Sequence, residues 1–165
     1  MAKDPSNLSL PYHKQVTITA ATQTVKVMPE NTLYWYGYND GIETCSNTNG
    51  WSNVSRSWAN PSAYNENNIY LNSSEGTNQG VGNKNNISSA NKMHAILMST
   101  LISSGYGLQI IGGTKSSLDG SNALYTQTVT NTTEHAEVLL TSQENISVIS
   151  MNGYRTGYLY ALWYE

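Results

Sequence analysis

The sequence predicts an all-β protein in which two antiparallel sheets pack as a sandwich. About nine or ten short segments are rich in β-branched and aromatic residues, and clusters of Gly, Asn and Ser separate them. Several of these segments alternate apolar and polar residues with a period of two, as half-buried strands do. The chain of 165 residues is also long enough to enclose one core between two sheets. From this pattern alone a sandwich or a barrel is expected.

The first strands are expected between residues 15 and 38. Apolar residues alternate with Thr and Lys over 16–20 and 24–27, which indicates two half-buried strands. The segment 32–38 reads TLYWYGY and predicts a third strand because it is dense in β-forming residues. The turn sequence Asn39-Asp40-Gly41 follows it, so we expect a hairpin there, with glycine at a positive φ.

The middle of the chain is predicted to contain two long polar loops. Residues 47–68 and 73–91 are rich in Asn, Ser and Gly without sustained periodicity, and long loops in compact domains are usually functional or disordered. A short strand is expected at 68–72, between them. The segment 92–103, KMHAILMSTLIS, fits either a helix or a strand, and its periodicity does not decide between the two.

The last third of the chain is expected to be a series of strands, with helix at most a minor component. We find no fixed-period repeat and no change of composition, so residues 12–165 are predicted to form a single domain. Residues 1–11 contain two prolines in a polar setting and are interpreted as a flexible segment or a cloning remnant. The strands expected here are 108–111, 124–130, 137–141, 146–151 and 158–163.

The charge of the chain argues against nucleic acid as a partner, and its short apolar runs argue against a membrane. Charged residues make up 12% of the sequence, and the net charge is -3. The eight Lys and Arg residues are scattered and form no basic stripe of the kind that neutralises phosphates. No apolar run approaches the roughly 18 residues that a membrane span needs.

Catalytic and metal-binding chemistry is not indicated. Cys45 is the only cysteine, and His13, His94 and His135 are too widely spaced for a local metal motif, so we expect no metal site and no cofactor. A glycosidase would need two carboxylates facing each other, and the sequence does not pair any of the scattered Asp and Glu residues. We therefore expect no catalytic residues and no enzyme activity.

Sugar recognition suits the composition better, because it needs flat apolar faces for stacking and neutral groups for hydroxyls. The segment 50–68 concentrates both kinds of side chain, with Tyr and Trp as platforms and Asn and Arg as polar contacts. The alternative is that its two tryptophans fold inward and anchor a long loop, since Trp is highly buried on average. The candidate ligand-binding residues are Trp51, Asn53, Arg56, Trp58, Tyr64 and Asn65.

A second candidate site follows from strict strand alternation. It would place Tyr34, Tyr36 and Tyr38 on one face, and Tyr158, Tyr160 and Tyr164 on another. These tyrosines would form either a floor for a saccharide or the outer wall of the sandwich beneath a loop. On the same pattern, the residues expected to face the core are Leu33, Trp35, Leu159, Ala161 and Trp163.

Two segments carry a resemblance to a known family. Residues 32–41 read TLYWYGYNDG, and residues 144–165 read ENISVISMNGYRTGYLYALWYE. They resemble modules appended to tail proteins of phages that infect Gram-positive bacteria, in which an LYWYG-like strand occurs early and an aromatic hairpin closes the domain. In particular, the chain is similar to a carbohydrate-binding module inserted into an evolved distal tail protein of a lactobacillus-type siphophage.

The resemblance implies a jelly-roll-like β-sandwich that binds host cell-wall polysaccharide from the virion, as part of an oligomeric tail protein. The chain departs from the pattern in its Asn-rich insertions at 47–68 and 73–91, so no sugar-contacting residue is carried over. The leading hypothesis is a non-catalytic carbohydrate-binding module that attaches a phage tail to host cell-wall saccharide. A structural module of the virion without a glycan ligand and a polysaccharide hydrolase are the alternatives.

Overall fold

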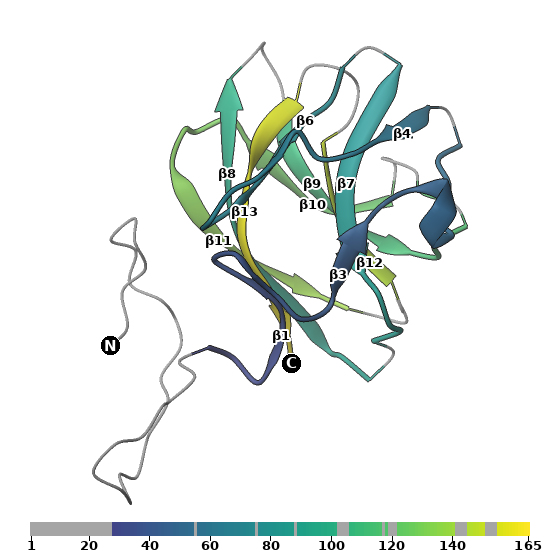
Figure 1. Cartoon of the computed structure of the whole chain (residues 1–165). Helices are drawn as coiled ribbons and strands as arrows, with labels where there is room; N and C mark the ends of the chain where they lie inside the picture. The colour runs from purple at the N-terminus through teal and green to yellow at the C-terminus, as the bar shows by residue number, and fades with distance from the viewer. Residues whose placement is uncertain are drawn as a thin grey trace, which may run out of the picture.

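The structure is a sandwich of two β-sheets, as the sequence predicts (Figure 1). It is a computed structural model and describes residues 28–54, 56–74, 76–87, 89–101, 106–116, 118, 122–140, 145–150 and 155–165. Within these ranges, seven strands form one sheet, which we call the first sheet, and six form the second sheet. Strand pairs are antiparallel except for one, in which β4 runs parallel to β7.

The strands of the first sheet follow the order β11-β8-β13-β1-β2, with β6 and β5 attached beside β13. Strand β13 is the centre of this sheet, because it pairs with β8 on one side and with both β1 and β6 on the other. The bounds are β1 Asn31–Trp35, β2 Tyr38–Asn39, β5 Ala63–Tyr64, β6 Ile69–Asn72, β8 Lys92–Leu101, β11 Thr133–Leu139 and β13 Arg155–Tyr164.

The second sheet follows the order β10-β9-β12-β7-β3, with β4 beside β7. One short 3₁₀ helix, η1, spans Asn47–Asn49 and ends at Gly50, whose φ is 79°. The bounds of the strands are β3 Ile42–Thr44, β4 Ser57–Ala59, β7 Thr77–Asn83, β9 Tyr106–Gly113, β10 Ala123–Thr128 and β12 Asn145–Ser150.

The main core lies between the two sheets. The first sheet contributes residues that alternate with outward-facing ones along β6, β8 and β13, and the second sheet contributes from β7, β9 and β12. Burial of each such aliphatic side chain is worth about 1.5–3 kcal/mol. Central members of this cluster are Leu71, Met93, Leu97, Leu159 and Leu162 from the first sheet, and Val81, Leu108, Ile110, Ile146 and Val148 from the second.

Two β-bulges change which side chains face this core. The register of β13 against β8 shifts between Leu159 and Ala161, so that Tyr160 is an extra residue. The register of β1 against β13 shifts between Thr32 and Tyr34 in the same way. Because an extra residue reverses the alternation beyond it, each bulge exchanges the inward and outward sets in the second half of its strand.

Several predicted elements are confirmed and others are wrong. The ambiguous segment 92–103 is strand β8 up to Leu101, and strands cover most of each segment expected from 108 to 163. The predicted loop 73–91 contains the buried strand β7, and the predicted loop 47–68 contains β4 and β5. Strand β7, TNQGVGN, was missed because Gly and Asn are poor strand formers in isolation but fit where neighbouring strands and side chains approach closely. Strands β4 and β5, SWA and AY, are too short to show a period of two.

The first predicted hairpin is also displaced. The segment 32–38 is divided into β1 and β2 by a turn at Tyr36 and Gly37, whose φ angles are 42° and 89°. The turn after Asn39 instead carries the chain from the first sheet to β3 of the second. The two strands predicted over 16–27 and the segment 1–11 lie outside the described residues.

Candidate functional site

The outer surface of the first sheet, which faces away from the core, carries a row of aromatic rings that we call the aromatic face. These rings occupy strand positions that alternate with core residues: Tyr70 lies between buried Ile69 and Leu71, and Tyr158 precedes buried Leu159. The residues of the aromatic face are Trp35, Tyr36, Tyr70, His94, His135, Tyr158, Tyr160 and Trp163.

Ring contacts run without a break along the aromatic face. They start with Tyr70 stacked on Tyr158 at 4.8 Å between centroids, and pass from Tyr158 to Tyr160 at 6.4 Å. Contacts of 5.9, 5.4 and 5.6 Å then lead through Tyr36 and Trp35 to Trp163, which lies 4.9 Å from the His94 ring. The row therefore crosses the sheet from β6 through β13 and β1 to β8.

A small apolar cluster supports the centre of the row. Ile96 and Ala161 are buried, and Trp35, Tyr36 and Tyr160 pack against them while remaining partly exposed. Partly exposed rings on a rigid sheet offer flat apolar surface together with phenol hydroxyls that can donate and accept hydrogen bonds. This combination can hold a ligand that has both C–H faces and hydroxyl groups.

One end of the aromatic face is polar. His94 Nδ1 lies 3.0 Å from His135 Nε2, and His94 Nε2 lies 2.9 Å from Glu165 Oε1. The Lys92 ammonium contacts Glu137 at 2.9 Å and Glu165 at 3.5 Å. The backbone of Glu165 also pairs with that of Lys92 in both directions, which fixes this carboxylate beside β8.

The two carboxylates at this end, Glu137 and Glu165, are each bound to a cationic or imidazole partner. The hydrogen bond from Lys92 holds the pKa of Glu137 below its usual value, and the hydrogen bond from His94 does the same for Glu165. Both are therefore charged at neutral pH, whereas a general acid needs a raised pKa to keep its proton.

Trp51, which the sequence suggested as a stacking platform, is buried. Its side chain is 0% exposed and packs with Cys45, Ile111 and Leu118. The prediction of an exposed platform is therefore wrong for Trp51, and the alternative of an inward anchor describes it correctly. The cause is the polar network at this edge of the second sheet, which satisfies the one polar atom of the indole and lets the ring enter the core.

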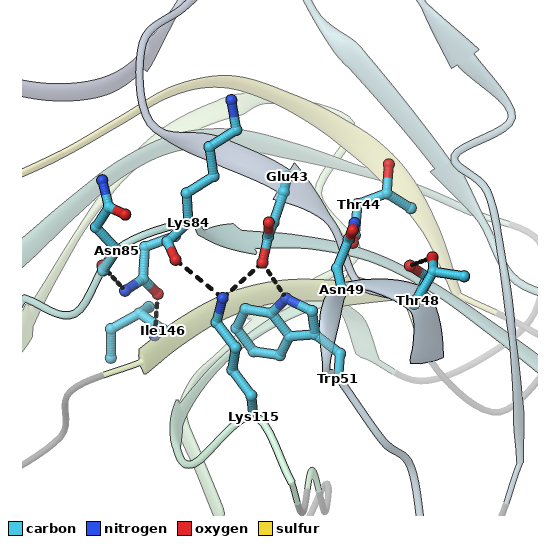
Figure 2. A network of polar contacts seen from close by, with 11 residues as sticks. Glu43, Thr44, Thr48, Asn49, Trp51, Lys84, Asn85, Lys115 and Ile146 are labelled. Carbon is cyan, nitrogen blue, oxygen red and sulfur yellow. Dashed lines mark hydrogen bonds and ion pairs between the residues drawn. The ribbon is translucent and has the colours of Figure 1, made fainter.

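Figure 2 shows this network, which we call the Glu43 network. Glu43 Oε1 accepts a hydrogen bond of 2.8 Å from Trp51 Nε1 and one of 2.6 Å from Lys115 Nζ. Lys115 Nζ also donates to the Lys84 carbonyl at 2.9 Å and lies 5.1 Å from the Trp51 ring centroid. These contacts fasten the segment around Trp51 to β3 and to the segment after β9.

The other predicted loop residues lie in two strands and in the turns beside them. Trp58 lies in β4 of the second sheet, where it is partly buried against the Trp51 cluster. Tyr64 lies in β5 of the first sheet, is 57% exposed, and its hydroxyl is 2.7 Å from Thr44 Oγ1. Nearby polar residues serve local turns: the Asn53 side chain accepts from the Arg56 N–H, and the Asn65 amide donates to Asn68.

The tyrosine sets predicted from alternation are partly wrong. Tyr158 and Tyr160 do share a face, but Tyr164 packs against the main core and Tyr34 is buried in it. Conversely, Ala161, Trp163 and Trp35 lie on the aromatic face rather than in the main core. The bulges in β1 and β13 account for these exchanges, because each adds one residue to the alternation.

The sequence analysis missed His94, His135 and Tyr70 as members of the site. The histidines belong to adjacent strands and meet only through the pairing of β8 with β11, so no local spacing connects them. Tyr70 gave a usable signal, since it alternates with Ile69 and Leu71 in a predicted strand.

The described residues show neither a membrane span nor a metal cluster. No helix in this part of the chain has the length and apolar character needed to cross a membrane. Within the same ranges, no group of three or more His, Cys, Asp or Glu side chains is placed to hold a metal ion.

Comparison with known proteins identifies a similar fold but no sequence family. No protein-family model and no curated protein matches the sequence. Among solved structures, a mutant of a carbohydrate binding module of family 29 is similar, with a TM-score of 0.53 and 8% sequence identity. The match covers 81% of this chain and 89% of that chain. At this identity the likeness concerns the fold, which is a β-sandwich in both.

Proposed function

We propose that this chain is a non-catalytic module that binds saccharide across the aromatic face of the first sheet. The unbroken row of rings from Tyr70 to His94 carries the proposal. Its partly exposed rings present stacking surface along a line, which suits an extended oligosaccharide better than a single compact ligand; these rings are Tyr70, Tyr158, Tyr160, Tyr36 and Trp35. Trp163 and His94 are each only 7% exposed and support the polar end of the row from within. The similarity to a carbohydrate binding module supports the same class of ligand on independent grounds.

The polar groups beside the row fit sugar chemistry. Tyrosine hydroxyls along the row, and the ring nitrogen of His135 that does not contact His94, can form hydrogen bonds with ligand hydroxyls. The ionised state of Glu137 and Glu165 supports a binding role over hydrolysis.

We further propose that the saccharide is a host cell-wall polysaccharide and that the chain is displayed on a phage tail. This step rests on the resemblance of residues 32–41 and 144–165 to phage tail modules. A tail protein in several copies would compensate for a weak single site, since simultaneous engagement raises the overall affinity by about 10²–10⁴.

Affinity electrophoresis of the purified chain tests the binding proposal. Suitable probes are mixed-linkage β-glucan, galactomannan, dextran and wall polysaccharide purified from Gram-positive bacteria. We expect at least one probe to retard the chain. Tyr158→Ala and Tyr160→Ala should each weaken that binding about tenfold, because truncating an aromatic anchor typically costs more than about 1 kcal/mol.

Tyr64→Ala is the matched control, because Tyr64 is an exposed tyrosine in β5 that belongs to the loop candidate rather than to the aromatic face. Its affinity should equal that of the wild type. Thermal melts of all three variants separate loss of contact from loss of fold. Loss of binding in Tyr64→Ala alone would move the site to the loop, and a chain that binds none of the probes would contradict the proposal.

The phage context has its own test. The fluorescently labelled chain should decorate cells of a Gram-positive strain whose purified wall polysaccharide retards it, and that polysaccharide should compete the label away. Absence of labelling on every strain of a broad panel, in a chain that still binds soluble polysaccharide, would refute the host-wall assignment and leave saccharide binding intact.

A further inference from the structure

The polar end of the aromatic face contains two histidines whose hydrogen bonds determine each other. His94 in β8 is 7% exposed, and its ring lies nearly parallel to that of exposed His135 in β11, at an interplanar angle of 7°. One nitrogen of His94 contacts Glu165 at 2.9 Å, and its other nitrogen contacts His135 Nε2 at 3.0 Å. No described group bonds to the remaining ring nitrogen, Nδ1 of His135.

The positions of the protons follow from this chain of contacts when both rings are neutral. The ionised carboxylate of Glu165 can only accept, so His94 must carry its hydrogen on Nε2. Its Nδ1 is then an acceptor, and His135 must donate from Nε2. A neutral imidazole has one hydrogen, so Nδ1 of the exposed residue His135 is left with a lone pair.

Resting on the saccharide-binding function proposed above, we propose that Nδ1 of His135 is a hydrogen-bond acceptor for a hydroxyl of a neutral saccharide at this end of the aromatic face. The His135 ring lies 5.5 Å from Trp163 at an interplanar angle of 4°, so the acceptor continues the row of rings. His94 and Glu165 act as positioning residues, because they select the tautomer of His135 without contacting the ligand.

The surrounding charges restrict the ligand to neutral sugars. The groups that face the pair are Lys92 from β8, Glu137 from β11 and Glu165 after β13. Two carboxylates against one ammonium leave a negative local charge, and Nδ1 of neutral His135 adds a lone pair beside them. A uronate carboxylate would therefore be repelled at this position, whereas a hydroxyl can donate to it.

Uptake of one proton by the two histidines changes Nδ1 of His135 from a hydrogen-bond acceptor to a donor. If His94 takes the proton, its Nδ1 must donate, so His135 accepts at Nε2 and carries its own hydrogen on Nδ1. If His135 takes it, both nitrogens of that ring carry hydrogen. Nδ1 of His135 is thus a donor in either case. Burial lowers the pKa of His135, which favours its neutral form, and a charge on His94 or on Lys92 lowers that pKa further while Glu137 raises it.

Two substitutions at His135 separate a ligand contact from a structural role. Asn places its amide at the position of Nδ1, so His135→Asn keeps an acceptor toward the ligand and loses the contact with His94. Gln reaches the position of Nε2, so His135→Gln keeps a donor toward His94 and loses the ligand-side acceptor. For the neutral polysaccharide that binds best, we expect His135→Gln to weaken affinity about threefold to tenfold and His135→Asn less than about twofold.

The inference would be overturned if His135→Asn bound the neutral polysaccharide more weakly than His135→Gln. It would also be overturned if both variants bound it as tightly as the wild type. In either event wild-type binding and its loss in Tyr160→Ala would leave the proposed function standing. Polygalacturonate, as an anionic probe, should not compete at pH 7.5, and competition equal to that of the neutral probe would also overturn the inference.

Imidazole ¹⁵N spectra of the wild-type chain provide a readout that a structural role would not move. At pH 8, Nδ1 of His135 should appear without hydrogen, and a saturating neutral polysaccharide, which donates to that nitrogen, should lower the pKa of His135 further. A protonated Nδ1 at pH 8 would refute the tautomer assignment directly, with or without a ligand.

Discussion

Removing the Glu43 carboxylate should destabilise the fold without affecting the aromatic face. Glu43 Oε1 accepts from both Trp51 Nε1 and Lys115 Nζ, at 2.8 and 2.6 Å (Figure 2). Trp51 is fully buried, so its N–H has no access to water once this acceptor is gone. The network lies at the edge of the second sheet, and the proposed ligand site lies on the outer surface of the first.

The size of the effect follows from the two hydrogen bonds. Glu43→Ala leaves a buried indole N–H without its acceptor, which costs about 1–3 kcal/mol. The lost ion pair with Lys115 adds less, about 0–1 kcal/mol, because both side chains are partly exposed at 18% and 24% and Lys115 keeps its bond to the Lys84 carbonyl. We therefore expect Glu43→Ala to lower the free energy of unfolding by about 2–3 kcal/mol, and Glu43→Gln, which keeps one acceptor, by about 1 kcal/mol.

Urea unfolding followed by tryptophan fluorescence measures this free energy. A double-mutant cycle with Lys115→Met should give a coupling of about 1 kcal/mol between Glu43 and Lys115, since the two groups are in direct contact. Saccharide binding by Glu43→Ala, measured where the variant is folded, should match the wild type. A Glu43→Ala variant within about 0.5 kcal/mol of the wild type would refute the reasoning, because that value is typical of substitutions without a structural role.

Two further predictions concern packing and pH. Gly82→Ala should cost about 1–3 kcal/mol of unfolding free energy by urea titration, because its Cβ would lie 2.5 Å from Trp51 Cη2. Gly76→Ala is the comparison, with open space around its Cβ and a φ of 79°, and should cost about 1–2 kcal/mol from backbone strain alone. A Gly82→Ala variant within about 0.5 kcal/mol of the wild type would contradict the close packing. Because the pKa of His135 is lowered in the folded chain, the unfolded chain binds the proton more tightly. The contribution of neutral His135 to the free energy of unfolding is therefore complete above 6.5, the ordinary pKa of histidine, and is lost as the pH falls below that value. The urea concentration at the unfolding midpoint should accordingly decrease as the pH is lowered from 7.5 to 5.5, and it should decrease less in His135→Gln. Parallel pH profiles of the two proteins would contradict this contribution of His135.

The fold class was predictable because it depends on many local signals that agree. Alternation in β6 and the β-forming residues of β13 each indicate a strand, and the cost of burying unpaired backbone then favours pairing them in sheets. Strand β7 was not predictable in this way. Its sequence, TNQGVGN, has little intrinsic preference for a strand, and the structure accommodates Gly82 there because Trp51 occupies the space that a side chain would fill.

The location of the candidate site was not predictable from the sequence. Tyrosine and tryptophan can be selected there as possible stacking residues, but the exposure of each depends on neighbours distant in sequence. Trp51 has an acceptor for its N–H in Glu43 and can therefore enter the core. Tyr160 faces outward because it follows inward Leu159, and the bulge at its position then turns Leu162 rather than Ala161 toward the core.

The two bulges together create the continuity of the aromatic face. If β13 alternated strictly from inward Leu159, Ala161 and Trp163 would point into the core, and the ring that joins Trp35 to His94 would be missing. If β1 alternated strictly from Thr32, which pairs with Trp163, Trp35 would point inward as well. Because Trp35 pairs with Ala161 across the two bulged strands, both register shifts act at the same place in the sheet. The row of rings therefore depends on two extra residues, Leu33 and Tyr160, and a strictly alternating version of the same strands would bury part of the proposed binding surface.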